Sequence, residues 1–492
     1  MRAATLRLLA TAALAVRADA ALPAALAKAS SVVKSGRVLA QLRTFFAPGG
    51  PGSRFRIGLE LGCVEGGQRL GTAASRRWRK PADNDLLDSK WGLESSLPLM
   101  VASSPWFARP GEGANASLVV FRPRAHARSD LSRCRAAVDP RNDRTDLWFV
   151  AMTDRGRCCD GGQLRDPGLL RHHFLVVSGE KATGEWLFRE HSERHAWRAP
   201  PTRDTAPRVR CFDNAMDVAL PPPAFLRRRG DERAAAAATA RARNASRRWL
   251  AMHAEGGVSP PEYDLRRALS TLYAPDWWEN KGKVPPFGDE LYVRKKMARP
   301  EHAEALFASK FCLVVEGFAP WTPRLAEAIA AGCVPAFLSP AYRPPFADVL
   351  DWPAFSVTLR RDDVGTLRDA LAKLDHAALH ANLLKVRDLF AFHVDAGGAG
   401  GALPLAVFEM WRRARARARG GDRYAGRDGR PGVVAALVAA DGAPARGRAR
   451  AARADVAYAC AGDGESCAYS LRGTTWNCST RTPMACGCVV VR

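Results

Sequence analysis

The clearest pattern of apolar and polar residues along the chain lies between Ser309 and Leu338. The continuous apolar run Phe311–Val315 predicts a short strand that is buried on both faces of a parallel sheet. After a break at Gly317, apolar residues return at helical spacing, and Gly332 is suited to end that helix. Val334–Leu338 then predicts the next strand. The pattern therefore predicts a strand, a loop, a helix and a second strand in succession.

The first turn of this predicted helix carries the candidate chemistry. Thr322 can cap the helix, and Pro323 suits its first position, where no backbone donor is needed. Unpaired N–H groups and the positive end of the helix dipole suit a phosphate group. Arg324 can pair with a diphosphate, and Glu327 can accept hydrogen bonds from ribose hydroxyls. The alternative is a local ion pair on a solvated face, which is common at this spacing.

Composition sets broader limits. At 492 residues with 47% hydrophobic residues, the chain has room for two ordinary domains plus additional segments, and wholesale disorder is excluded. The formal net charge of +24 is typical of proteins that bind nucleic acid. However, the excess is mostly arginine spread along the chain, and no helix-turn-helix, zinc-finger or aromatic RNA-binding signature accompanies it. We therefore expect no nucleic-acid partner, whereas anionic sugar donors and acidic glycans are compatible with the charge.

The beginning of the chain predicts a secretory route. Residues 1–20 have a basic start, a short Leu/Ala stretch and an Ala-Asp-Ala ending, which is typical of a cleaved signal peptide. A short signal anchor is the alternative. Twelve cysteines fit the same route. Cys312 and Cys333 flank the central helix, and we expect both to be buried core thiols.

The end of the chain has a different composition. Residues 416–453 are rich in Gly, Ala, Arg and Pro, which predicts a flexible linker. The tail at 454–492 contains five cysteines but no histidine, so a small disulfide-bonded unit is favoured over a zinc site. The D-x-D triplet at 83–85 lies in a loop context and does not follow an apolar strand, so we expect no metal there.

Two groups of residues in one register carry a family resemblance. The first group is Ser309, Phe311, Cys312, Leu313, Gly317, Arg324, Leu325, Glu327, Ala328, Ile329, Gly332, Cys333 and Pro335. The second is Pro345, Phe346, Asp348, Trp352, Phe355 and Val357. Together they resemble the nucleotide-sugar half of the exostosin-like glycosyltransferases. The chain departs from that pattern at Val315, where the family usually has Pro, and at Trp321 and Thr322, which replace a Ser-Ser pair.

The resemblance implies an α/β fold of GT-B architecture, with two Rossmann-like lobes facing a cleft. We place the N-terminal acceptor-side lobe at 21–245 and the C-terminal nucleotide-sugar-binding lobe at 246–415, followed by the linker and the Cys-rich tail. In such enzymes Arg324 would contact the diphosphate, Glu327 the nucleotide ribose, and the Gly317–Thr322 loop the sugar. No cofactor or metal is expected, because basic residues and a helix dipole stabilise the leaving diphosphate.

Further similarity gives the remaining site candidates. The run 170–180 resembles the family's G-x-D-H-F segment, with His173 aligned to the family histidine. An inverting transfer needs a general base, and His173 could serve, or it could hold a loop or the core by hydrogen bonding. Glu180, which follows an apolar run and Gly179, is an equal candidate, so the base stays open. Gly256 ends a run similar to the first strand of the donor lobe and would allow a ligand to approach the backbone.

These observations predict an inverting glycosyltransferase that transfers a sugar from a nucleoside diphosphate sugar, most often UDP-linked, to a glycan or polysaccharide hydroxyl. The expected location is the secretory pathway, with the Golgi lumen first and secretion second. Membrane association through the N-terminus and a hetero-oligomer are both left open. The alternatives are a catalytically silent homologue that acts as a glycan-binding or complex subunit, and a basic secreted protein that binds polyanions.

Overall fold

The computed structural model describes parts of the chain separated by gaps. These are residues 27–60, 93–109, 112–119, 129–141, 143–151, 169, 171–177, 179, 212–222, 226–227, 240–254, 264–273, 290–294, 297, 299–315, 321–338, 342–393, 401–420, 456–460, 466–471, 474–479 and 487–491. Signal-peptide residues 1–20, the D-x-D triplet and nearly all of the predicted linker lie outside these ranges. Every structural statement below concerns the described residues.

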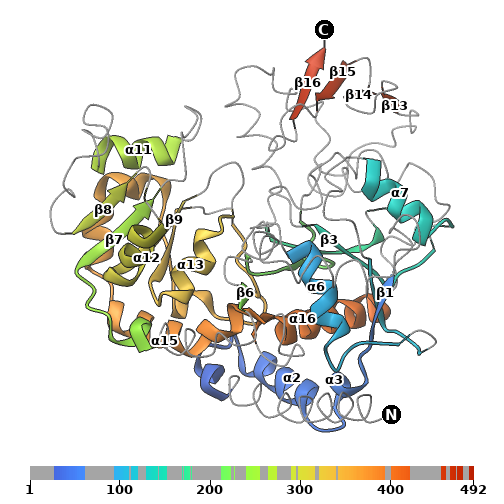
Figure 1. The fold of residues 1–492 in the computed structure, drawn as a ribbon, viewed down its shortest axis with the longest axis horizontal. Coiled ribbons are helices and arrows are strands. Elements are labelled where there is room, and N and C mark those ends of the chain that lie inside the picture. The colour runs from blue at the N-terminus through green and yellow to red at the C-terminus, as the bar shows by residue number, and fades with distance from the viewer. Residues whose placement is uncertain are drawn as a thin grey trace, which may run out of the picture.

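The first half of the molecule is built on a five-stranded parallel sheet. Its strands lie side by side in chain order: β1 (Ile57–Glu60), β2 (Ala116–Val119), β3 (Leu147–Ala151), β4 (His173–Val176) and β5 (Val218–Ala219). Strands β2 to β5 are buried along their whole length, as expected for short apolar runs covered on both faces. Helices α6 (Leu93–Ala102) and α7 (Ser129–Val138) accompany this sheet (Figure 1).

The second half contains another five-stranded parallel sheet, in the order β11-β10-β9-β7-β8. Its strands are β7 (Trp249–Ala254), β8 (Leu291–Arg294), β9 (Ser309–Val315), β10 (Val334–Leu338) and β11 (Val357–Thr358). Its helices are α11 (Asp264–Tyr273), α12 (Arg299–Ala308), α13 (Arg324–Ala330), α14 (Leu367–Ala372) and α15 (His376–Val386). The short 3-10 helices are η8 (Trp352–Ala354), η9 (Arg361–Thr366) and η10 (Arg387–Phe390). Two parallel sheets with flanking helices confirm the predicted α/β fold with two lobes.

The strand order of the second sheet reverses between β7 and β9. From β7 the chain moves outward to β8, and from β9 it moves the other way to β10 and β11. In open α/β sheets, ligands bind at the carboxyl ends of the strands at such a switch point. The fold therefore marks the ends of β7 and β9 as the place to look for a ligand.

One helix of the second half reaches back to the first half. Helix α16 (Ala402–Gly420) runs beneath the first sheet in Figure 1 and contacts β5. Helix α2 (Gly36–Phe46) packs on it, with the Phe45 ring centroid 5.3 Å from that of Phe408 and 5.0 Å from that of Trp411. The lobe limit predicted at residue 415 falls inside α16. The proposed second lobe thus ends in a helix that belongs to both halves by its contacts.

The remaining short elements complete the described parts. Segments η1 (Ser30–Val32) and α3 (Pro51–Arg54) flank α2, and β6 (Leu226–Arg227) pairs with β12 (Phe392–His393) in parallel. In the tail, β13 (Val456–Cys460), β14 (Ser466–Leu471), β15 (Thr474–Ser479) and β16 (Gly487–Val491) form an antiparallel sheet in chain order.

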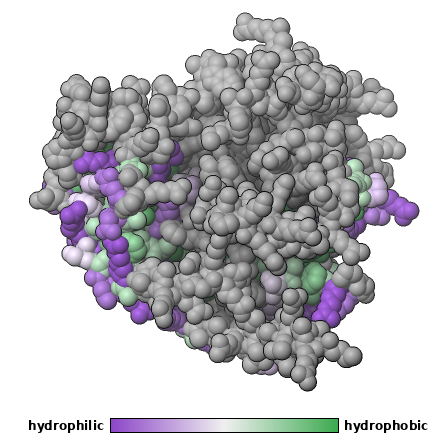
Figure 2. All heavy atoms as spheres, viewed as in Figure 1, coloured by the Kyte–Doolittle hydropathy of each residue, from purple (hydrophilic) through white to green (hydrophobic). Residues whose placement is uncertain are grey.

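Large hydrophobic side chains are mostly buried among the described residues. On the face shown in Figure 2, hydrophilic side chains lie along the left and lower-right margins, with smaller hydrophobic areas among them. Among the described large hydrophobic residues, Leu272 alone stands out as exposed, at 50%. None of the described helices combines the length and the apolar character needed to cross a bilayer.

Candidate functional site

The strand–helix–strand unit forms as its sequence pattern predicts. Strands β9 and β10 pair in parallel, and α13 joins them. The helix begins at Arg324, and Pro323 before it already has helical dihedral angles (φ −61°, ψ −20°). The Thr322 hydroxyl oxygen accepts a hydrogen bond from the Arg324 backbone N–H at 3.4 Å. Thr322 therefore supports the start of the helix, although the helix is one residue shorter than predicted at this end.

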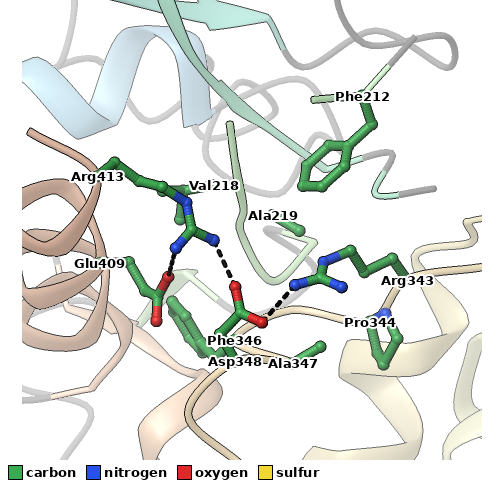
Figure 3. Close-up of a pocket in the computed structure, with 10 residues that line it drawn as sticks. All are labelled: Phe212, Val218, Ala219, Arg343, Pro344, Phe346, Ala347, Asp348, Glu409 and Arg413. Carbon is green, nitrogen blue, oxygen red and sulfur yellow. Dashed lines mark hydrogen bonds and ion pairs between the residues drawn. The ribbon is translucent and has the colours of Figure 1, made fainter. Parts of the chain in front are cut away.

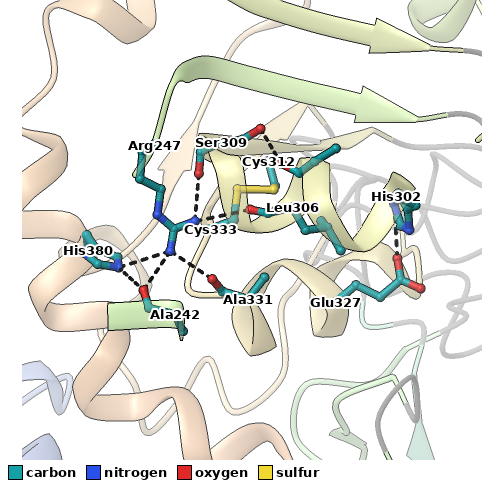
Figure 4. Close-up of a disulfide and its surroundings, with 11 residues drawn as sticks. Ala242, Arg247, His302, Leu306, Ser309, Cys312, Glu327, Ala331, Cys333 and His380 are labelled. Carbon is teal, nitrogen blue, oxygen red and sulfur yellow. Dashed lines mark hydrogen bonds and ion pairs between the residues drawn. A yellow bond between two sulfur atoms is a disulfide. The ribbon is translucent and has the colours of Figure 1, made fainter. Parts of the chain in front are cut away.

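The two charged residues predicted to bind the donor lie on this helix, and both are half-buried. The Glu327 carboxylate lies against His302 of α12, with 3.7 Å between Oε2 and the histidine Nε2 (Figure 4). Burial lowers the pKa of His302; the carboxylate of Glu327 acts in the opposite direction, and Arg324 lowers it further. Electrostatic interactions therefore couple the side chains of His302, Arg324 and Glu327.

The C-terminal end of α13 is held by two arginines from distant segments. Arg247 donates from Nη2 to the Ala331 carbonyl at 2.9 Å, and Arg387 donates from Nε to the Ala330 carbonyl at 2.7 Å. The last carbonyls of a helix have no partner within it, and cations favour this end of the dipole. Gly332, with φ of 67°, ends the helix as predicted. The helix is consequently anchored at the end opposite Arg324.

A disulfide fixes the two strands on either side of α13. Cys312 and Cys333 are bonded, with their Cα atoms 5.7 Å apart (Figure 4). The prediction of two buried thiols was right about burial, at 4% and 0% exposure, and wrong about the thiols. The register brings Pro335 opposite Cys312, so that Cys333 lies within bonding reach of its partner.

The predicted glycines follow the two strands at the switch point. Gly256 comes two residues after the end of β7 and Gly317 two residues after the end of β9, but both lie outside the described residues. Strands β7 and β9 are parallel neighbours, with Met252 opposite Cys312. The carboxyl ends of β7 and β9, which precede the two glycines in the sequence, therefore lie at the same edge of the sheet, which is the edge where a ligand is expected.

His173, one of the two candidates for the base, lies inside the first half. It is 1% exposed, its ring stacks on Trp148 with centroids 4.2 Å apart, and its Nδ1 lies 2.9 Å from the Met216 carbonyl oxygen. It also begins β4, whereas ligands bind at the carboxyl ends of parallel strands. This geometry favours the alternative in which His173 holds a loop to the core. Glu180 lies outside the described residues.

The neighbouring His172 and Asp217 are also buried supports. His172 is 0% exposed with Nε2 at 3.4 Å from an oxygen of Asp139, and burial lowers the pKa of His172 to about 3. The Asp217 carboxylate accepts hydrogen bonds from the backbone N–H groups of Phe174, at 3.2 Å, and Asp213, at 2.8 Å. These contacts fix the 213–217 turn against β4.

A cluster of charged residues joins the two halves beside a small cavity. The Asp348 carboxylate bridges Arg343 and Arg413, with N–O distances of 2.6 Å to each (Figure 3). Arg413 of α16 also pairs with Glu409 at 3.1 Å. Burial tends to raise the pKa of Asp348, but the two guanidinium groups hold it at about 2. The cavity is lined by Phe212, Val218, Ala219, Arg343, Pro344, Phe346, Ala347, Asp348, Glu409 and Arg413.

Backbone contacts reinforce this joint. The Arg343 N–H donates to the Gly179 carbonyl at 3.0 Å, and Phe346 adopts φ of 54°, which is unusual for a residue with a side chain. A Cβ atom on Gly179 would collide with the carbonyl oxygen of Arg343. Of these residues, sequence reasoning noted Phe346 and Asp348 as part of a motif but missed Arg343, Glu409 and Arg413. Nothing in the local pattern around Arg413 distinguishes it from the other arginines of its helix.

Comparison with known proteins supports the resemblance noted in the sequence. Residues 171–374 match the model of the Exostosin GT47 domain. In Arabidopsis thaliana, a protein named a probable glycosyltransferase is 33% identical over 117 residues, covering 23% of this chain and 21% of its own length. The probable glucuronoxylan glucuronosyltransferase IRX7 of the same plant is 38% identical over 84 residues, covering 17% of this chain and 19% of its own.

A rice relative extends the comparison. A probable glucuronosyltransferase of Oryza sativa subsp. japonica is 36% identical over 120 residues, covering 24% of this chain and 25% of its own. The chain thus matches about a fifth to a quarter of the length of these relatives. The matched domain contains β4, β7 to β11 and α13, and so includes the switch point and both charged residues of the helix.

Proposed function

With the exostosin GT47 resemblance confirmed over residues 171–374, we propose that the protein is an inverting glycosyltransferase that uses a nucleoside diphosphate sugar. The observation that carries the proposal is the strand reversal between β7 and β9, beside which α13 presents Arg324 and Glu327. Arg324 would pair with the diphosphate, and Glu327 would accept hydrogen bonds from ribose hydroxyls. Gly256, Gly317 and Thr322 would shape the same pocket.

The acceptor is proposed to be a glycan or polysaccharide hydroxyl, and the donor to be UDP-linked. Two of the three relatives named above carry names that refer to glucuronosyl transfer, which makes UDP-glucuronic acid the first donor to test. The arginines give the chain charge that is compatible with an anionic donor. No resident cofactor or metal is proposed.

The base is proposed to be Glu180 in preference to His173. Glu180 directly follows Gly179, whose carbonyl accepts from Arg343 at the joint between the halves. A carboxylate at that position could take the proton of the acceptor hydroxyl as the sugar leaves its diphosphate. His173 is held by Trp148 and the Met216 carbonyl deep in the first half. An E180Q variant should lose most transfer activity while it still binds UDP.

A secretory location is proposed, with the Golgi lumen first. The disulfide between Cys312 and Cys333 fits an oxidising compartment. Membrane association through the N-terminus and a hetero-oligomer belong to the same proposal and await fractionation of the full chain.

The deciding test is UDP and GDP release by the purified protein with a panel of nucleotide sugars and glycan acceptors. Replacing Arg324 by Ala should lower kcat/KM for the donor by about 10-fold to 100-fold, because a charge-assisted contact is lost. The matched control is Arg37→Ala, an exposed arginine on α2, which should change nothing. Donor binding without any turnover would favour the silent homologue, in which Trp321 and Thr322, both 4% exposed, replace the usual Ser-Ser pair. Absence of nucleotide binding would refute the proposal.

A further inference from the structure

We infer that His302 of α12 is a positioning residue for nucleotide recognition, holding the Glu327 carboxylate in the orientation that receives the ribose hydroxyls. The inference rests on the proposed function, and it adds a residue that the family pattern quoted above does not contain. His302 lies 25 residues before Glu327 in the sequence and on a different helix.

The contact is specific in its geometry. The His302 Nε2 lies 3.7 Å from Glu327 Oε2, with the two side chains 22% and 28% exposed. This distance is longer than a hydrogen bond. The ring therefore acts by occupying space beside the carboxylate, which leaves the Glu327 side chain fewer rotamers. A glutamate side chain otherwise loses considerable rotamer freedom when it is ordered for binding. By limiting the rotamers in the free protein, His302 reduces the conformational entropy that Glu327 loses when the ligand binds.

The spacing between the two helices is set by a shared apolar layer. Ala305 and Leu306 of α12 pack in one buried cluster with Ala328 of α13 and with Cys312 and Cys333. The disulfide and the hydrogen bonds at the C-terminal end of α13 further stabilise that layer. The packing of the two helices therefore places His302 beside Glu327.

The charge state of His302 suits this role. Burial lowers its pKa below the ordinary value of 6.5, against the opposing effect of the Glu327 carboxylate, and Arg324 acts in the same direction as burial, so the neutral ring is favoured. A neutral ring beside Glu327 leaves the negative charge of the carboxylate available for ribose hydroxyls, whereas an imidazolium would compete for it. The alternative reading is that His302 only fills space between α12 and α13.

The test compares two nucleotides that differ only in the ribose hydroxyls: UDP and 2′,3′-dideoxyuridine diphosphate. Binding of each to the full chain is measured by calorimetry for wild type, His302→Ala, His302→Gln and Glu327→Gln. We expect His302→Ala to weaken UDP binding by about threefold to tenfold. Binding of the dideoxy nucleotide should change by less than about twofold, since it makes no contact with Glu327. His302→Gln, which keeps a polar side chain of similar reach, should restore most of the UDP affinity.

The controls separate this inference from the proposed function. Glu304→Ala, on the same helix and 64% exposed, should leave the binding of both nucleotides unchanged. Equal weakening of both nucleotides by His302→Ala, or no weakening of UDP binding, would overturn the positioning role while UDP binding by wild type upholds the donor site. If wild type binds neither nucleotide, the proposed function fails and this inference fails with it. If His302→Ala does not fold, His302→Gln and His302→Asn are compared with each other on the same two ligands.

Discussion

The C-terminal end of α13 is held by Arg247, and the joint between the halves is held by Arg413. The two arginines have different kinds of partner. Arg247 donates to four carbonyl oxygens: Leu306 and Ser309 from Nη1, at 3.2 and 2.9 Å, and Ala242 and Ala331 from Nη2, at 2.9 Å each. Its Nη2 also lies 3.4 Å from Nε2 of His380, so all of these partners are neutral groups. Arg413 instead pairs with the carboxylates of Asp348 and Glu409. The first cluster is a set of neutral acceptors around one charge, and the second is a network of opposite charges.

The pKa values follow from that difference. Burial lowers the pKa of Arg247 to about 10, because no carboxylate compensates its charge. Burial acts in the same direction on Arg413, but the carboxylates of Glu409 and Asp348 raise its pKa overall. We conclude that Arg247 is needed for its geometry, as a fork that satisfies four carbonyls at once, whereas Arg413 is needed for its charge.

The two regions also differ in what they connect. The C-terminal end of α13 combines the guanidinium of Arg247, the disulfide and a glycine that ends the helix, all within one half of the molecule. The joint adds ion pairs and backbone contacts around a small cavity to the apolar core that the two halves share. The first region therefore fixes α13 within one half, whereas the second fixes the two halves to each other.

The largest effect is expected from Arg247→Ala. Four carbonyls lose their shared donor, and we expect the free energy of unfolding to fall by about 3 to 5 kcal/mol. Arg247→Lys should recover less than half, since an ammonium group cannot reproduce the fork. Chemical denaturation measures both, with the exposed Arg243→Ala of the same segment as the matched control. If Arg247→Ala lowers the free energy of unfolding by less than about 1 kcal/mol, the conclusion that Arg247 is needed for its geometry is wrong.

A smaller effect is expected at the joint. Asp348→Ala and Arg413→Ala should each lower the free energy of unfolding by about 2 to 3 kcal/mol, because each removes one member of a largely buried network of opposite charges. The double variant should lose less than the sum, with a coupling of about 1 to 2 kcal/mol. Asp369→Ala, at an exposed position of α14, is the control. Strict additivity of the two single losses would show that the pair does not act as a unit.

The smallest effect distinguishes the clusters by pH. His376 packs beside the Arg247 cluster, and burial lowers its pKa from 6.5 to about 4, so it resists protonation in the folded state. Its contribution to stability is complete above pH 6.5 and declines as the pH falls toward 4, by about 1 kcal/mol in total, because the partly exposed ring is screened by solvent. Asp348, with a pKa lowered from 3.8 to about 2, contributes stability that is lost only as the pH falls from 3.8 toward 2.

The measurement is thermal unfolding of wild type, His376→Gln and Asp348→Asn across this range. His376→Gln should flatten the decline between pH 6.5 and 4, and Asp348→Asn should flatten only the decline below 3.8. Identical slopes for the two variants in the upper window would contradict the assignment of separate windows to the two clusters.

Local chemistry in the sequence determined the central unit. The apolar runs of β9 and β10 favoured buried strands, and Gly332 ended the helix because a left-handed backbone suits glycine best. The register of residues shared with exostosin-like proteins also anticipated the matched domain. These features depend on neighbours within one turn or one strand, and such neighbours are visible in a linear pattern.

Tertiary structure alone decided which distant residues meet. Cys312 and Cys333 became a disulfide because the strand register brings them together, and spacing along the chain does not reveal register. Asp348 and Arg413 are 65 residues apart, and His302 and Glu327 lie on different helices, so their pairing depends on how whole elements pack. The sequence determined the elements through short-range chemistry, and packing determined the charged contacts because those contacts span elements that only the fold brings together.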